Sequence, residues 1–125
     1  MHIQKNILVC EDDRLTRTVI SMVLKHAGYH VEVACDGQKA LEKIRDGPIS
    51  FEILITDNKM PRLSGIELVG KLRELNHPIR VIMITAGAVQ IDAEMRARLR
   101  LDGFLTKPFM DDELLDCVNK LAETG

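Results

Sequence analysis

Five short apolar runs alternate with amphipathic segments along this 125-residue chain, and this alternation constrains the fold more than any other feature. The runs have the length of β-strands and lie at residues 7–10, 31–33, 53–55, 81–84 and 104–105. The first, third and fourth are continuously apolar, as expected of central parallel strands that are covered on both faces. The second alternates apolar and polar residues, which indicates an edge strand.

Apolar residues recur at helical spacing between these runs. The expected helices cover approximately residues 15–23, 40–44, 68–75, 91–99 and 114–121. This (βα)5 order predicts an α/β fold with a doubly wound, parallel, five-stranded sheet, because five units are too few for an eight-stranded barrel. A common strand order for such a sheet is 2-1-3-4-5, the flavodoxin-like arrangement. The length suits one ordinary domain, so we expect residues 1–125 to form a single domain.

The charges and cysteines argue against several classes of function. With 17 basic and 19 acidic residues the formal net charge is −2, which gives no general reason for direct nucleic-acid binding. The three cysteines form no CxxC pair, so neither a disulfide framework nor a zinc site is expected. No segment approaches about 18 consecutive apolar residues, and the first residues lack the apolar run of a signal peptide. We therefore expect a cytoplasmic protein without a membrane span.

Polar residues follow four of the five expected strands. These groups are Glu11-Asp12-Asp13, Thr56-Asp57, Thr85-Ala86 and Thr106-Lys107-Pro108. Taken singly, most have an ordinary structural explanation: Asp13 suits the N-cap of the following helix, Thr85 suits a turn, and Lys107 suits a solvated surface. Asp57 is less ordinary, because a carboxylate at the end of an apolar strand is partly buried and needs a partner.

Taken together, the same residues indicate a metal site and phosphoryl-transfer chemistry. If the first and third strands are neighbours, Glu11, Asp12 and Asp57 lie close together, and their mutual repulsion favours a hard divalent cation. Oxygen-only ligands with room for water suit Mg²⁺. Lys107 and the Thr85 hydroxyl would then hold phosphoryl oxygens, while a carboxylate can act as the nucleophile and become an acyl phosphate.

Four motifs in register resemble the receiver domain of bacterial response regulators, in particular the chemotaxis-regulator-like kind. They are the apolar strand with Glu11, Asp12 and Asp13 and then Arg17, the DxxMPxxxG pattern from Asp57 to Gly65, the Thr85-Ala86 pair, and the aromatic-xx-Lys-Pro pattern from Phe104 to Pro108. The resemblance covers the whole chain, in order and at the spacing of the family. It implies a protein of two-component signal transduction.

The resemblance also implies a role for each site residue. Asp57 would take a phosphoryl group from a histidine kinase or a histidine phosphotransfer protein. Mg²⁺ would be bound directly by Asp12 and Asp57, through a water by Glu11, and by the backbone carbonyl of Lys59. Thr85 and Lys107 would contact the phosphoryl group, and the family typically has a cis peptide before Pro108.

The same resemblance implies how the signal leaves the site. Movement of Thr85 towards the phosphoryl group would let Phe104 change rotamer, which alters the face formed by the fourth helix, the fifth strand and the fifth helix. Such a protein is a phosphoacceptor that assists its own phosphorylation and dephosphorylation rather than a conventional enzyme. It would be a monomer or a phosphorylation-dependent dimer with a downstream effector that the sequence does not identify.

One departure from the family pattern concerns the fourth helix, since Arg100-Leu101 replaces the usual Gly-Ala pair. Arg96 and Arg100 lie four residues apart, so their like charges weaken a helix there slightly. Arg96, Arg98 and Arg100 form either part of a partner surface or a solvated basic face.

Three other interpretations stay open beside the receiver. A pseudo-receiver would act only as an interaction domain, without phosphorylation. An aspartate-nucleophile phosphatase needs a second acid two residues after the nucleophile, where this chain has Lys59. A flavin-binding module needs a phosphate loop after the first strand, where Glu11, Asp12 and Asp13 would repel the phosphate.

Overall fold

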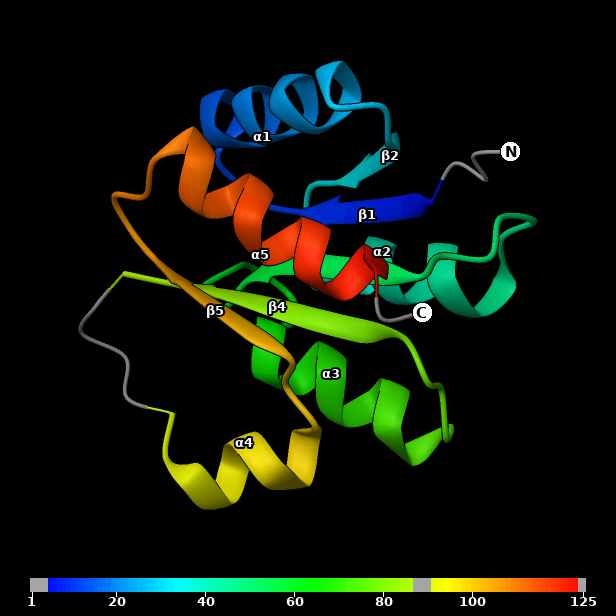
Figure 1. Cartoon of the computed structure of the whole chain (residues 1–125). Helices are drawn as coiled ribbons and strands as arrows, with labels where there is room; N and C mark the ends of the chain where they lie inside the picture. Colours follow the sequence, from blue (N-terminus) through cyan, green and yellow to red (C-terminus); the bar gives the residue numbers. More distant parts are fainter. Residues whose placement is uncertain (1–4, 87–90, 124–125) are drawn as a thin grey trace.

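The computed structural model describes residues 5–86 and 91–123 and contains one parallel sheet with helices on both faces (Figure 1). Its strands are β1 (Asn6–Cys10), β2 (His30–Ala34), β3 (Ile53–Asp57), β4 (Arg80–Thr85) and β5 (Gly103–Thr106). Every pairing is parallel and the order is β2-β1-β3-β4-β5, which confirms the expected topology. The alternating run at residues 31–33 does form an edge strand, because β2 pairs with β1 alone.

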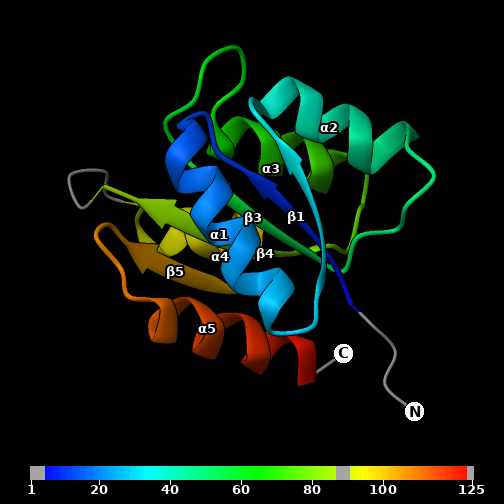
Figure 2. The ribbon, with the colours of Figure 1, turned by 90° about the horizontal axis from the view of Figure 1, so that it is seen from above.

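Within the described residues, four helices connect successive strands and a fifth follows β5. They are α1 (Arg14–His26), α2 (Gly37–Asp46), α3 (Gly65–Glu74), α4 (Ala93–Leu99) and α5 (Asp111–Glu123). Helices α1 and α5 cover one face of the sheet, and α2, α3 and α4 cover the other (Figures 1 and 2). Among the described residues, no helix has both the length and the apolar composition needed to cross a bilayer.

The central strands are continuously apolar because each of their faces is buried. Leu8, Leu54 and Val81 point into the core beneath α2, α3 and α4. Their neighbours Ile7 and Ile53 point into the opposite core, beneath α1 and α5. Since alternate side chains of a strand point to opposite faces, two cores of this kind require apolar residues at every position.

Side-chain caps decide where the helices begin. The carboxylate of Asp13 accepts a hydrogen bond from the Thr16 amide at the start of α1, which confirms the capping interpretation. Ser64 and Glu67 form a reciprocal capping box at the start of α3. These caps fix how each helix leaves the edge of the sheet where the strands end.

The fourth helix begins two residues later than expected and ends at the expected residue. Asp92 caps it by accepting a hydrogen bond from the Met95 amide at 2.8 Å, so the helix begins at Ala93 and Ile91 lies outside it. It ends at Leu99, because Arg100 adopts a left-handed conformation with φ of 52°. The like-charge pair expected within one helix is therefore absent, since Arg100 follows the helix.

Candidate functional site

The predicted site residues meet at the carboxyl edge of the sheet. Glu11 directly follows β1, Asp57 and Thr85 are the last residues of β3 and β4, and Lys107 directly follows β5. Parallel strands end at the same edge, so residues far apart in the sequence become neighbours here. The order β2-β1-β3-β4-β5 places β1 and β3 side by side, which brings the two acidic segments together.

Glu11, Asp12 and Asp57 form an acidic cluster in which one carboxylate oxygen of each lies within 4.8 Å of the others. The side chain of Glu11 is fully buried and that of Asp57 nearly so, whereas Asp12 is exposed. Three carboxylates at this separation repel one another unless a cation lies between them. The donor set consists only of oxygen atoms and has one side open to solvent, which fits a hydrated Mg²⁺ ion.

Lys107 supplies one positive charge to this cluster. Its Nζ lies 2.8 Å from Oε1 of Glu11 and 2.7 Å from Oδ2 of Asp57, so one ammonium group bridges β1 and β3. Burial favours the neutral amine, but the hydrogen bonds to Asp57 and Glu11 outweigh it and raise the pKa of Lys107. The peptide bond between Lys107 and Pro108 is cis, as the resemblance implied.

The pKa of the Glu11 carboxylate is strongly raised. Burial raises its pKa from 4.5 to about 7, and the nearby Asp57 contributes in the same direction. The hydrogen bond from Lys107 opposes this change without cancelling it. Glu11 therefore gains a proton easily while the site holds only one cation, and a second cation would favour its ionised form.

Arg17 fixes the backbone of the loop between β1 and α1. Its Nη1 donates hydrogen bonds to the carbonyl oxygens of Glu11, at 2.8 Å, and Asp12, at 3.4 Å. This role of Arg17 was not predicted, because the prediction considered the residues that follow each strand and Arg17 lies inside a helix. Its position four residues after the N-cap Asp13 is the signal that could have identified it, since that spacing turns the side chain back towards the loop.

Asn58 and Gly65 shape the loop that follows Asp57. Asn58 accepts hydrogen bonds from two amides at the start of α3, from Gly65 to its backbone carbonyl at 2.9 Å and from Ile66 to its side chain at 3.1 Å. A Cβ atom added at Gly65 would collide with the carbonyl oxygen of Asp57. In the same loop, the Lys59 amide donates to Oδ1 of Asp57 at 3.3 Å, and the Lys59 side chain is exposed. The role of Asn58 was not predicted.

Thr85 and Phe104 lie on the same face of the sheet. The register pairs Met83 with Phe104 and Thr85 with Thr106, so their side chains point towards the helices α3 and α4. Thr85 is buried and its carbonyl oxygen accepts a hydrogen bond from the Lys107 amide at 2.8 Å. The structure thus brings the predicted site residues to one edge of the sheet, except Phe104, which is the second residue of β5 and lies back from that edge.

An apolar groove of about 480 Å³ begins beside the site, between α1 and the segment after β5. Lys107 is one of its lining residues, and Leu15, Val19 and Phe109 supply apolar walls. Leu15 is 74% exposed and Val19 is 46% exposed, so the groove offers apolar surface to solvent. A contiguous patch of exposed apolar side chains often marks a site where another protein binds.

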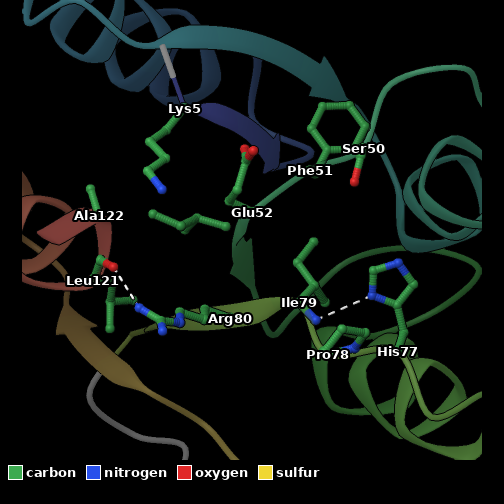
Figure 3. Close-up of a pocket in the computed structure, with 11 residues that line it drawn as sticks. Lys5, Ser50, Phe51, Glu52, His77, Pro78, Ile79, Arg80, Leu121 and Ala122 are labelled. Atoms are coloured by element: carbon green, nitrogen blue, oxygen red, sulfur yellow. Dashed lines mark hydrogen bonds between the residues drawn. The ribbon is translucent and has the colours of Figure 1, made fainter. Parts of the chain in front are cut away.

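A second hollow, of about 270 Å³, lies at the opposite edge of the sheet (Figure 3). Lys5, Glu52 and Arg80 line it with charges of both signs, and Arg80 donates to the carbonyl oxygen of Leu121 at 2.6 Å. None of the predicted site residues lies there. The chemistry therefore concentrates at the carboxyl edge.

Comparison with known proteins agrees with this arrangement. The sequence-family model named response regulator receiver domain matches residues 7–119 of this chain. The transcriptional regulatory protein CpxR of Escherichia coli (strain K12) is 37% identical over 109 residues, which cover 87% of this chain and 45% of that protein. The response regulator RR06 of Streptococcus pneumoniae is 41% identical over 106 residues, which cover 83% of this chain and 46% of that protein. This chain thus spans about half the length of these curated relatives.

Solved structures show the same fold. The receiver domain of the Francisella response regulator 1452 superimposes with a TM-score of 0.87 at 31% identity, covering 97% of this chain and 98% of that one. The chemotaxis response regulator CheY4 of Vibrio cholerae gives a TM-score of 0.85 at 28% identity, with 95% and 99% covered.

Proposed function

Since the chain belongs to the family of response regulator receiver domains, we propose that it is a phosphorylation switch in which Asp57 accepts the phosphoryl group. The observation that carries this proposal is the Lys107 ammonium, which lies within 2.8 Å of both Glu11 and Asp57 at the carboxyl edge of the sheet. A nearly buried carboxylate beside a fixed cation and two further acids has the equipment of phosphoryl transfer. We propose that residues 1–125 form one such domain.

Mg²⁺ is the cofactor in this proposal. Asp12 and Asp57 would hold it directly, Glu11 through a water molecule, and the carbonyl oxygen of Lys59 would complete the protein ligands. When bound, the ion supplies positive charge that offsets the developing charge of the transferred phosphoryl group. The oxygen-only donor set and its open side support this choice over zinc or copper.

The phosphoryl step is a displacement at phosphorus. A carboxylate oxygen of Asp57 forms the new P–O bond while the P–N bond of a phosphohistidine breaks, and the imidazole leaves with its electron pair. Lys107 exchanges its contact with the Asp57 carboxylate for a phosphoryl oxygen, and the Thr85 hydroxyl donates to another. In this way the chain assists its own phosphorylation, and hydrolysis of the acyl phosphate resets it.

We propose that the donor is a histidine kinase or a histidine phosphotransfer protein that docks on the apolar groove beside Lys107. Leu15 and Phe109 line that groove next to the acceptor, so a protein bound there would present its phosphohistidine to Asp57. Phosphorylation would then draw Thr85 towards the phosphoryl group and let Phe104 follow it. The resulting change in the face of α4, β5 and α5 would be read by a downstream effector or by a second copy of the domain.

Incubation with acetyl phosphate tests the proposal directly. Intact mass is measured with and without Mg²⁺, beside the Asp57→Asn variant. We expect a Mg²⁺-dependent gain of one phosphoryl group in the natural protein and no gain in the variant. If the folded protein gains no mass in any condition, the switch is refuted, and the chain acts as a pseudo-receiver that binds partners without phosphorylation.

A further inference from the structure

The guanidinium group of Arg96 lies over the ring of Phe104, with 4.0 Å between its central carbon and the ring centroid. This distance is well within the range of a cation–π interaction. Within residues 5–86 and 91–123, no carboxylate lies within 4.0 Å of this guanidinium, so the aromatic ring is its partner. An ion pair therefore does not account for the position of Arg96, whereas the ring contact does.

Phe104 occupies a position from which it can respond to Thr85. The two residues lie on adjacent strands and their side chains share the face that α4 covers. Phe104 is half-buried there: it packs against the core, and the Arg96 guanidinium lies over its ring. In the proposed function the ring moves towards the space beside Thr85, and its contact with the Arg96 guanidinium restrains that movement.

Arg73 holds the C-terminal end of α4, the helix that carries Arg96. Its Nε donates to the carbonyl oxygen of Leu99 at 2.7 Å, and its Nη2 donates to that of Arg100 at 3.0 Å. The same guanidinium also donates to the carbonyl oxygens of His77 and Ile79, in the turn that follows α3. One half-buried arginine thus ties the C-terminal end of α4 to α3.

This tie matters for Arg96, which precedes the last helical residue by three positions. The helix has only seven residues, so tertiary contacts rather than its own hydrogen bonds fix its place. With its end held by Arg73, α4 presents Arg96 to Phe104 from a fixed point. The ring contact then has a definite geometry that is lost when the ring moves.

We propose that Arg96 is a positioning residue that holds Phe104 in the unphosphorylated state. The inference rests on the proposed function, because it assigns to Arg96 the restraint that phosphorylation of Asp57 must overcome. A contact made only in the unphosphorylated state shifts the equilibrium between the two states by its own free energy. Its loss therefore strengthens the binding of any ligand that prefers the phosphorylated state.

Beryllium fluoride with Mg²⁺, a mimic of the phosphoryl group on Asp57, provides the test by calorimetric titration. We expect Arg96→Gln to bind it about twofold to fivefold more tightly than the natural protein, the factor that corresponds to an exposed cation–π contact. Arg98→Gln is the matched control, since it removes the same charge from the same helix without touching the ring. Arg96→Lys keeps a cation over the ring and should restore the natural affinity.

Equal affinities of Arg96→Gln and Arg98→Gln would overturn the role of Arg96 and leave the proposed function standing. Absence of binding by the natural protein would overturn both. A second readout is available because the chain has only three phenylalanines, at positions 51, 104 and 109. With fluorinated phenylalanine, Arg96→Gln should move the Phe104 resonance of the unphosphorylated protein and leave the other two unchanged; an unchanged Phe104 resonance would contradict the contact.

Discussion

The ammonium nitrogen of Lys107 lies 2.7 Å from Oδ2 of Asp57, so a cation that follows β5 neutralises the carboxylate at the end of β3. The same nitrogen reaches Glu11, which is fully buried. In the proposed function, Lys107 and a divalent cation would compete for these carboxylates. This competition would determine how the site responds to metal and to substitution.

Replacement of Lys107 by methionine should strengthen Mg²⁺ binding while it weakens the fold. Loss of the ammonium leaves Glu11 and Asp57 without their cation, which we expect to cost about 2 kcal/mol of unfolding free energy without metal, after allowance for the partial exposure of Lys107. Mg²⁺ then finds free carboxylates, so calorimetric titration should give a several-fold lower Kd. Lys39→Met removes the same charge from an exposed position of α2 and serves as the control. Weaker Mg²⁺ binding by Lys107→Met than by Lys39→Met would contradict the competition.

Glu11 should make the metal-free protein less stable as pH rises from about 4.5 to about 7. Its pKa is about 7 in the folded protein and 4.5 without burial, so between these values the folded state binds more protons than the unfolded state. The contribution is complete below the lower value and is lost as pH rises through the higher one, amounting to at most about 3 kcal/mol. Urea unfolding in a chelator at several pH values measures it.

The Glu11→Gln variant isolates this contribution. A variant is needed because other carboxylates, such as Asp13 and Glu67, have lowered pKa values in the folded protein, so their contribution to stability increases as pH rises. The unfolding free energy of the natural protein minus that of the variant should therefore decrease steadily as pH rises over this range. A difference that does not vary with pH would show that Glu11 keeps an ordinary pKa.

The general architecture and the acidic cluster were predictable because both depend on order along the chain. Strands buried on both faces are continuously apolar, and the residues that come directly after parallel strands gather at one edge of the sheet. That rule was sufficient to bring Glu11, Asp57 and Lys107 together. The cation contact between Phe104 and Arg96 was not predictable, because it depends on where α4 lies and on which way each side chain turns.

The start of α4 was also beyond the sequence pattern. The apolar spacing of Ile91, Met95 and Leu99 suits one helix. However, the Asp92 side chain accepts a hydrogen bond from the Met95 amide and so starts the helix after Ile91. Ile91 nevertheless packs against the core, which explains why it is apolar. A residue can thus belong to an apolar stripe without belonging to the helix.

Gly65→Ala should destabilise the protein and disturb the acceptor loop. The added methyl group would collide with the carbonyl oxygen of Asp57, which the rigid end of β3 cannot move without loss of sheet hydrogen bonds. We expect a cost of about 1–3 kcal/mol, as for other overpacked sites. Gly70→Ala is the matched control, since a methyl group there meets no atom within 4 Å apart from the neighbouring backbone of its own helix, and alanine is the better helix former. Chemical denaturation of both variants decides the matter, and equal effects would refute the steric argument.

Arg100→Gly should stabilise the protein, although it removes a charged side chain. Arg100 has a φ of 52°, a left-handed conformation that costs a non-glycine residue about 1 kcal/mol and that glycine adopts freely. The tie to Arg73 survives, because it uses the backbone carbonyl of Arg100. We expect a gain of up to about 1 kcal/mol in unfolding free energy, reduced by the greater entropy of glycine in the unfolded chain. Arg98→Gly, inside α4, should instead lose about 1 kcal/mol, and a loss of similar size at both positions would show that the left-handed residue carries no strain.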